Sequence, residues 1–292
     1  MALAEHRPEP RQGDLSDWQR NQFGTLPIVT RRCPACGHDN SDLRPHRYSL
    51  GIWTAKQCYR CRFLYLDKAP DYSAMKSQIS WENSTKLETE WRAKTRSIQT
   101  KLSKSTRWRL HLFPRRTIPM LVTRYAKPGN VLDLGCGDGG QIGGLPADYV
   151  PYGIEISQAL GEVADQRFRE QGGHAVIAPC LHGLDAFPAE YFSAASLRSY
   201  LEHELHPFDV LAKLHRVMQS GGVAVVKVPN YACWNRIVMG RRWSGFRHPD
   251  HLNYFTPSSL KQMARRAGFA TKFLPFGRLP TADNMWALLI RS

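Results

Sequence analysis

Four of the seven cysteines stand in two pairs whose spacing suits a metal site. The pairs, which 21 residues separate, are Cys33-x2-Cys36 and Cys58-x2-Cys61. Each pair can turn two thiolates toward one point, and the intervening segment is long enough for a short hairpin to return. Because four thiolates complete a tetrahedral shell, His38 and His46 are not expected to be ligands. The pattern predicts one zinc ion without an open coordination position, and therefore a structural role rather than a catalytic one.

The residues around these cysteines resemble a zinc ribbon. Pro34 and Gly37 supply a tight turn at the first pair, and the second pair leads into a predicted strand that ends at Tyr65. The odd number of cysteines and the absence of an export signal argue against a disulfide framework. We place the ribbon at residues 31–70, after a polar extension over residues 1–30 that we expect to be mobile. No window approaches the roughly 20 apolar residues of a membrane span, so we expect a cytoplasmic protein without a membrane partner.

A second group of chemistry-bearing residues follows an apolar segment further along the chain. Residues 131–139, VLDLGCGDG, read as a strand that runs into a glycine-rich turn, where the backbone can approach a ligand closely. About 20 residues later, residues 152–156 read as a second strand that contains Glu155 near its end. A carboxylate there can accept hydrogen bonds from two ribose hydroxyls. Together the two segments indicate a ligand that contains adenosine.

Asp133 helps to decide between two classes of ligand, a dinucleotide and a ligand with an amino-acid portion, because the glycines alone are compatible with both. Gly135, Gly137 and Gly140 also satisfy a dinucleotide fingerprint. A carboxylate two residues before the first glycine suits an ammonium group, as in a bound amino acid, and would repel a pyrophosphate. The stretch resembles motif I of class I S-adenosylmethionine-dependent methyltransferases. That resemblance implies that Asp133, Gly135 and Gly137 line the methionine and ribose portion of the cofactor, and that Glu155 binds the ribose diol.

Later segments resemble the same family in the same order. A fourth predicted strand over residues 191–197 precedes Leu201-Glu202-His203, and a helix near residues 208–219 is expected to end at Gly221-Gly222. A fifth strand over residues 223–230 then ends in VPN. The resemblance implies an α/β, Rossmann-like methyltransferase domain over residues 115–292, with a mostly parallel sheet and an antiparallel C-terminal strand.

The segment after the third predicted strand, residues 174–178, departs from the family. Many members carry an acidic residue there, near the adenine amino group, whereas this chain has Pro179-Cys180-Leu181-His182. We therefore expect main-chain groups and Leu181 to hold the adenine, with Asp185 as an alternative.

Three histidines are candidates for the catalytic base. Methyl transfer is an in-line displacement, so the enzyme must align the acceptor and, for a hydroxyl or carbon acid, remove a proton. His203 directly follows the fourth predicted strand and can act as a base near neutral pH, or it can simply shape the site. His248 and His251 lie in an insertion over residues 243–257, where they can serve as base or as substrate contacts.

This insertion resembles the PxHxxYFT segment of bacterial methyltransferases that belong to sugar, polysaccharide and secondary-metabolite pathways. Tyr254 and Phe255 are expected to pack. Nearby arginines can neutralise a phosphate or serve only as solubilising surface charge; they are Arg241, Arg242 and Arg247. Thr256 and Pro257 predict the start of the next helix.

The charge of the chain is concentrated toward its beginning. The formal net charge is +15 over 292 residues, and the basic excess lies mainly before residue 130, including a predicted basic helical connector over residues 71–114 with an amphipathic helix over residues 84–103. We expect an enzyme that methylates a small anionic acceptor, such as a nucleotide-linked or carrier-linked sugar. An RNA methyltransferase that uses the ribbon and basic helix to bind nucleic acid is the main alternative, and a non-catalytic binding module is a third. The acceptor atom and the oligomeric state stay open.

Overall fold

The computed structural model describes residues 27–71, 116–275 and 277–292. The predicted basic connector with its amphipathic helix, and nearly all of the predicted N-terminal extension, lie outside the described residues. Within the described ranges, no helix is both long and apolar enough to cross a bilayer.

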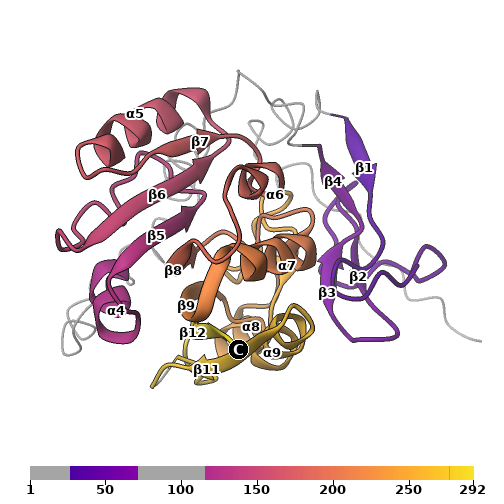
Figure 1. The fold of residues 1–292 in the computed structure, drawn as a ribbon. Helices are drawn as coiled ribbons and strands as arrows, with labels where there is room; N and C mark the ends of the chain where they lie inside the picture. Colours follow the sequence, from indigo (N-terminus) through magenta and orange to yellow (C-terminus); the bar gives the residue numbers. More distant parts are fainter. Residues whose placement is uncertain (1–26, 72–115, 276) are drawn as a thin grey trace, which may run out of the picture.

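A seven-stranded sheet forms the centre of the molecule, in the order β11-β12-β9-β8-β5-β6-β7 (Figure 1). Its strands are β5 (Gly129–Leu134), β6 (Tyr149–Glu155), β7 (Ala175–Ile177), β8 (Phe192–Arg198), β9 (Met218–Pro229), β11 (Phe269–Phe273) and β12 (Asn284–Arg291). The first five run parallel to one another, whereas β12 is antiparallel to both β9 and β11. This arrangement confirms the predicted α/β fold with a mostly parallel sheet and an antiparallel C-terminal strand.

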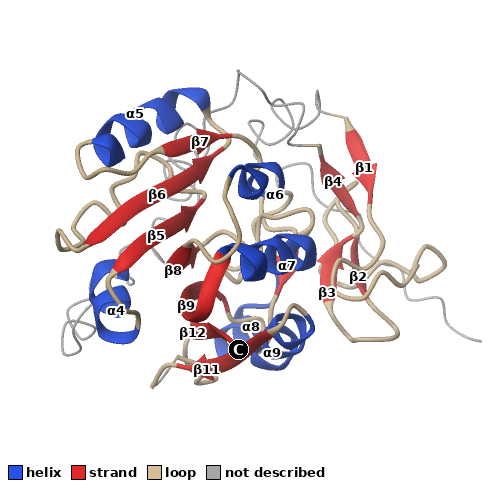
Figure 2. Cartoon of the chain, viewed as in Figure 1, coloured by secondary structure: helices blue, strands red, loops and turns tan. Residues whose placement is uncertain are grey.

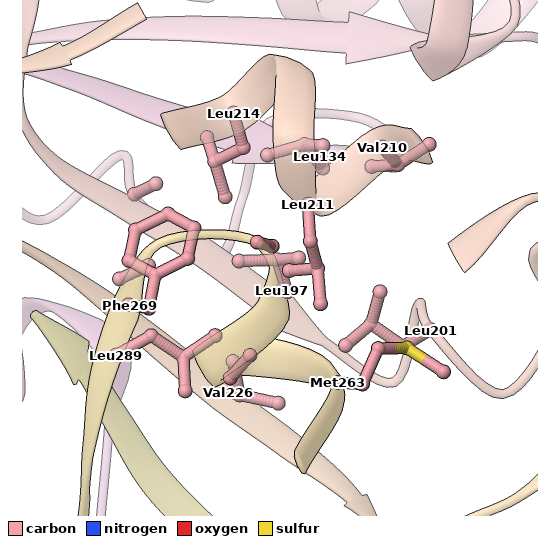
Figure 3. Close-up of a cluster of buried hydrophobic side chains, with 14 of the residues drawn as sticks. Leu134, Leu197, Leu201, Val210, Leu211, Leu214, Val226, Met263, Phe269 and Leu289 are labelled. Atoms are coloured by element: carbon pink, nitrogen blue, oxygen red, sulfur yellow. The ribbon is translucent and has the colours of Figure 1, made fainter. Parts of the chain in front are cut away.

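Helices cover both faces of this sheet (Figure 2). The described helices are α4 (Ile118–Tyr125), α5 (Gln158–Arg169), α6 (Cys180–Gly183), α7 (Pro207–Val217), α8 (Trp234–Met239) and α9 (Pro257–Arg266), with single 3-10 turns η3 (Leu184–Ala186) and η4 (Gly240–Arg242). Of these, α8 and η4 contain no buried residue. Alternate residues of β5 serve the two faces, because neighbouring side chains of a strand point in opposite directions. Leu134 packs with the α7 and α9 side, as Figure 3 shows, and Val131 packs with the α4 and α5 side.

The helix starts follow local capping chemistry. Thr256 accepts a hydrogen bond from the Ser259 backbone N–H, the Ser259 hydroxyl accepts one from the Thr256 N–H, and Pro257 occupies the first turn of α9. The helix predicted near residues 208–219 does not end at Gly221-Gly222 as predicted from the sequence. Helix α7 stops at Val217, and Gly221-Gly222 lie inside β9, where the register with β8 shifts between Phe192 and Ala194. Gly221 has φ +74°, so these glycines accommodate an irregular strand rather than a helix end.

The cysteine-containing segment forms two small sheets beside the carboxyl ends of the parallel strands. Strand β1 (Ile28–Thr30) pairs with β4 (Lys68–Pro70), and β2 (Ala55–Gln57) pairs with β3 (Leu64–Leu66). Figure 1 shows β5 and β6 pointing toward this part of the chain. Residues 28–30 lie within the predicted extension, and they are ordered here because their backbone groups pair with residues 68–70.

A strand from the predicted insertion completes the ribbon sheet. Strand β10 (Asn253–Tyr254) pairs antiparallel with β3, and Leu252 and Tyr254 are buried with Trp53 and Leu64 in a shared cluster. The cysteine segment and the insertion are therefore one packed unit, although nearly 200 residues separate them in the chain.

Candidate active site between the sheet edge and the cysteine segment

A cavity of about 1290 Å³ lies where the parallel strands end. Its walls come from the turns after β5, β6, β7 and β8 on one side and from residues 29–37 of the ribbon on the other. In open α/β sheets this edge is the usual place for a ligand, because the loops after several strands converge there.

The glycine-rich turn and Glu155 meet at one end of the cavity. Gly135 and Gly137 adopt φ of +68° and +56°. The Glu155 carboxylate is buried; it accepts hydrogen bonds of 2.9 Å from the Gly137 N–H and of 2.9 Å from the Ser157 N–H. A Cβ at Gly135 would lie 2.9 Å from the Tyr200 ring, so this position has room only for glycine. All three predicted residues line the cavity, and the carboxylate is held in place by backbone groups.

Asp133 is close to this turn in sequence but does not line the cavity. Its side chain is 1% exposed, and one carboxylate oxygen, Oδ2, has no hydrogen-bond partner among the described residues. Burial raises the pKa of Asp133 to about 7. A buried oxygen without a partner is energetically costly, and a cationic group that reached it would stabilise the charged form. An ammonium group fits this oxygen chemically, which is the partner that the sequence suggested.

Residues after β7 form the next part of the wall. Leu181 lines the cavity together with Pro179 and His182. Asp185, the alternative adenine partner, is not among the lining residues; its carboxylate instead forms an ion pair with Lys213 at 2.5 Å.

Only one of the three candidate histidines lines the cavity, and it is His203. Its Nδ1 donates to the Asp250 carbonyl oxygen at 2.9 Å and lies 3.6 Å from a carboxylate oxygen of the same residue. Arg247 pairs with the other carboxylate oxygen at 3.1 Å. Burial alone would raise the pKa of Asp250, but His203 and Arg247 lower it to about 2. For His203 the effect of burial is the opposite, because burial lowers the pKa of a histidine. The negative charges of Asp250 and Glu202 outweigh this effect, so the net shift of the His203 pKa is upward.

The other two histidines are buried behind the cavity wall. The His251 ring lies 4.7 Å from the His203 ring between centroids, and its Nδ1 donates to the Gly245 carbonyl at 2.9 Å. The Nε2 of His248 lies 3.2 Å from the Tyr254 hydroxyl, and its ring is stacked on Phe246. Burial lowers the pKa of His248 to about 4. The structure thus joins His251 to His203, whereas His248 packs against Tyr254 and Phe246 and does not line the cavity.

The four cysteine sulfurs form a compact group at the ribbon side. The Sγ atoms of Cys33 and Cys61 are 3.5 Å apart, and those of Cys36 and Cys58 are 3.6 Å apart. All four lie within 4.8 Å of one another, and none is in a disulfide. Zinc–sulfur bonds of about 2.3 Å in a tetrahedron place the sulfurs about 3.8 Å apart, so the group has the dimensions of a zinc site.

Residues that sequence reasoning missed connect the two walls. The Arg31 guanidinium donates to the Leu205 carbonyl at 2.7 Å and to the Asn253 Oδ1 at 3.0 Å, and it also reaches the Leu66 carbonyl at 3.2 Å. Asp250, which fixes His203, is the second missed residue. Its position between His248 and His251 in the sequence was the available signal for it.

Comparisons with known proteins identify the family of this domain. The family model described as "Methyltransferase domain" matches residues 107–272, more than half of the chain. A solved S-adenosylmethionine-dependent methyltransferase from Thermotoga maritima is 17% identical, with 65% of this chain and 96% of that one covered and a TM-score of 0.47. One from Methanosarcina mazei is 15% identical, with 60% and 97% covered and a TM-score of 0.46. One from Archaeoglobus fulgidus is 14% identical, with 70% and 99% covered and a TM-score of 0.46. The comparison with curated proteins gives no match.

Proposed function

Since the chain belongs to the family of methyltransferase domains, we propose that it is an S-adenosylmethionine-dependent enzyme that methylates a small anionic metabolite. Nucleotide-linked or carrier-linked sugars and secondary metabolites are the classes we favour. The observation that carries this proposal is the cavity, which continues from the glycine-rich turn to the ribbon and has room for a second substrate beside the cofactor.

The cofactor end of the proposed site uses the residues at the sheet edge. Glu155 accepts the ribose hydroxyls, Gly135 and Gly137 let the backbone approach the methionine portion, Asp133 balances the ammonium group, and Leu181 packs on the adenine. S-adenosylmethionine supplies an electrophilic methyl group on a sulfonium ion. The protein's own task is to hold this group in line with an acceptor and to exclude water.

Arginines on the remaining wall support an anionic acceptor. Those that line the cavity are Arg31, Arg32, Arg198, Arg247 and Arg266. The acidic side chains there are as numerous, but several already have partners within the protein. Glu155 binds two backbone N–H groups, Asp250 pairs with Arg247, and Glu204 accepts a hydrogen bond from Tyr200. Most of the arginines have partners too: Arg31 and Arg266 donate to main-chain carbonyls, Arg198 donates to Gln141, and Arg247 pairs with Asp250. The formal charges of the wall therefore balance, and a phosphate or carboxylate group of the acceptor would bind an arginine in place of one of these contacts.

His203 is the residue that we assign to the acceptor. It is the candidate histidine on the cavity wall, and Asp250 fixes its orientation. His251 supports it from behind. The proposed catalytic set does not include His248, because its nitrogen lies against Tyr254 and its ring against Phe246.

We assign one structural zinc ion to the four cysteines. Cys33 and Cys36 lie on the cavity wall, so this ion would hold the ribbon side of the acceptor site in shape. A four-thiolate site has no open position and supplies no chemistry to the transfer.

The test uses methyl-labelled S-adenosylmethionine, purified protein and a cell extract separated into small anionic molecules and nuclease-sensitive polymer. We expect label in the small-molecule fraction with the unchanged enzyme and with Glu162→Ala, an exposed α5 carboxylate, but not with His203→Ala. Label in the nuclease-sensitive fraction would instead favour the RNA methyltransferase and overturn the proposal. Label in the small fraction with His203→Ala at full rate would remove His203 from the acceptor site.

A further inference from the structure

Three side chains next to the cavity form a donor set that is distinct from the cysteine group. One carboxylate oxygen of Glu202 and one ring nitrogen each of His203 and His251 lie within 4.8 Å of one another. We propose that these residues bind one divalent transition-metal ion, such as zinc. Two histidines and one glutamate are a ligand set of catalytic zinc sites, in which the fourth position is left for water or substrate.

The surroundings of the two histidines match those of metal ligands. A ligating histidine usually donates its other ring N–H to a carbonyl or carboxylate, which fixes the tautomer and the direction of the ring. Here Nδ1 of His203 donates to the Asp250 carbonyl, and Nδ1 of His251 donates to the Gly245 carbonyl, both at 2.9 Å. The coordinating atom would then be Nε2 in each ring. Each ring is thus held by its own backbone contact.

Glu202 provides a separate observation that points to a cation. The residue is 2% exposed, and its Oε2 has no hydrogen-bond partner among the residues that the structure describes. A buried carboxylate oxygen without a partner is costly, and it is satisfied by a proton or by a cation.

The position of the set leaves the ion accessible from one direction. Of the three residues, His203 lines the cavity, whereas Glu202 and His251 lie behind it. An ion bound here would have its open position toward the proposed acceptor, and an acceptor hydroxyl bound to it would release its proton to water more readily. This role in activation rests on the proposed function, whereas metal binding itself does not. In this arrangement His203 acts on the acceptor through the ion.

The experiment counts and distinguishes the ions without using any acceptor. Protein freed of metal by a chelator is titrated with CoCl2 and followed by absorption and by elemental analysis. Cobalt in the cysteine group gives a thiolate charge-transfer band, whereas cobalt in a nitrogen and oxygen site gives only weak visible bands. We expect two ions per chain, of which one has the thiolate band and the other lacks it.

Variants assign the second ion to its ligands. Glu202→Gln, which keeps the shape of the side chain, and His251→Ala are each expected to lose the second ion and keep the first. His248→Ala, a buried histidine of the same insertion, is the matched control and is expected to bind both. A single ion per chain in the unchanged protein would overturn the proposal, as would a second ion that survives both Glu202→Gln and His251→Ala. The thiolate band of the first ion shows in each variant that the cysteine group, in the ribbon that pairs with β10 of the insertion, is still assembled. Because the titration uses no acceptor, a failure here is separable from a failure to find label in small molecules.

Discussion

The two ends of the cavity are built in different ways. The cofactor end comes from consecutive strands and the turns that follow them, and the residues that contact each other there are close together in the sequence. Glu155, for example, is held by Gly137 and Ser157, which are 18 and 2 residues away. The parallel sheet brings these turns together whatever the rest of the chain does.

The acceptor end is assembled from three segments that are far apart in the chain. Arg31 of the ribbon reaches Leu205 and Asn253, and His203 depends on Asp250, which is 47 residues away. The comparison indicates that the cofactor end is a property of the sheet, whereas the acceptor end depends on the ribbon and the insertion being docked. The two ends should therefore respond differently to the same disturbance.

Loss of the cysteine site should give the largest difference between the effects on the acceptor end and on the cofactor end. In Cys58→Ser the ribbon wall should lose its fixed shape, because a structural zinc site contributes folding free energy directly. We expect methyl transfer to fall by roughly a thousandfold or more, while calorimetry finds an unchanged cofactor dissociation constant. Cys233→Ser, which changes a buried cysteine outside the group, is the control. Equal loss of cofactor binding and activity would show that the two ends are not independent.

Glu155→Ala should have the opposite effect, weakening cofactor binding while leaving the acceptor end unchanged. Two ribose hydroxyls would lose a charged acceptor, and each such hydrogen bond is worth about 1.5–3 kcal/mol. The cofactor dissociation constant should rise on the order of a hundredfold, whereas the acceptor KM at saturating cofactor should change little. Calorimetry and initial rates measure the two quantities. Glu162→Ala, on the exposed side of α5, should change neither, and an unchanged cofactor constant in Glu155→Ala would refute the assignment.

The role of Asp133 at the cofactor end can be tested by measuring how the free energy of unfolding depends on pH. The folded protein keeps the Asp133 proton up to about pH 7, whereas the unfolded chain releases it near 3.8. The folded state therefore binds more protons between these values, and this group lowers the free energy of unfolding as pH rises through that window. Asp133→Asn should raise the free energy of unfolding at pH 8 by about 2 kcal/mol, with a smaller gain at pH 5.

The same variant should bind the cofactor more weakly, because an amide cannot balance an ammonium charge. Urea denaturation at the two pH values measures the stability, and calorimetry measures the binding. The exposed Asp148→Asn serves as the reference. If Asp133→Asn and the unchanged protein show the same pH dependence, the buried carboxylate is not the group responsible.

The contrast between the two ends also explains what the sequence could predict. The fold class follows from the VLDLGCGDG segment and from the order of the later strands, and the structure confirms it. Gly135 and Gly137 line the cavity because they belong to the turn that directly follows β5, and Leu181 lines it because the short helix α6 begins soon after β7. For such residues the sequence position already fixes the position at the sheet edge. Their roles toward the cofactor stay predictions.

The acceptor end was only partly predictable, for a physical reason. The pairing of β10 with β3 joins segments almost 200 residues apart, and no local pattern encodes it. Without that pairing, nothing distinguishes His248, which packs on Phe246, from His251, which packs on His203. Arg31 likewise has no local signal in the sequence, since two of its partners are main-chain carbonyls and a third is the side chain of Asn253, which is 222 residues away.

Arg31 gives the smallest effect and the finest test of the comparison. Arg31→Ala removes donors to the Leu205 and Leu66 carbonyls and to Asn253, which connect the ribbon to the segment after His203. The remaining contacts, including those of β10 with β3, still hold the ribbon, so we do not expect the variant to unfold. We expect the stabilisation of the transition state for methyl transfer to fall by about 1–2 kcal/mol. That corresponds to about a tenfold fall in kcat/KM for the acceptor, with the cofactor dissociation constant unchanged. Arg60→Ala, an exposed arginine of the same ribbon, should match the unchanged enzyme in both measurements. A weaker cofactor dissociation constant in Arg31→Ala would mean that the ribbon also shapes the glycine-rich turn, and the acceptor and cofactor ends would then have to be treated as one site.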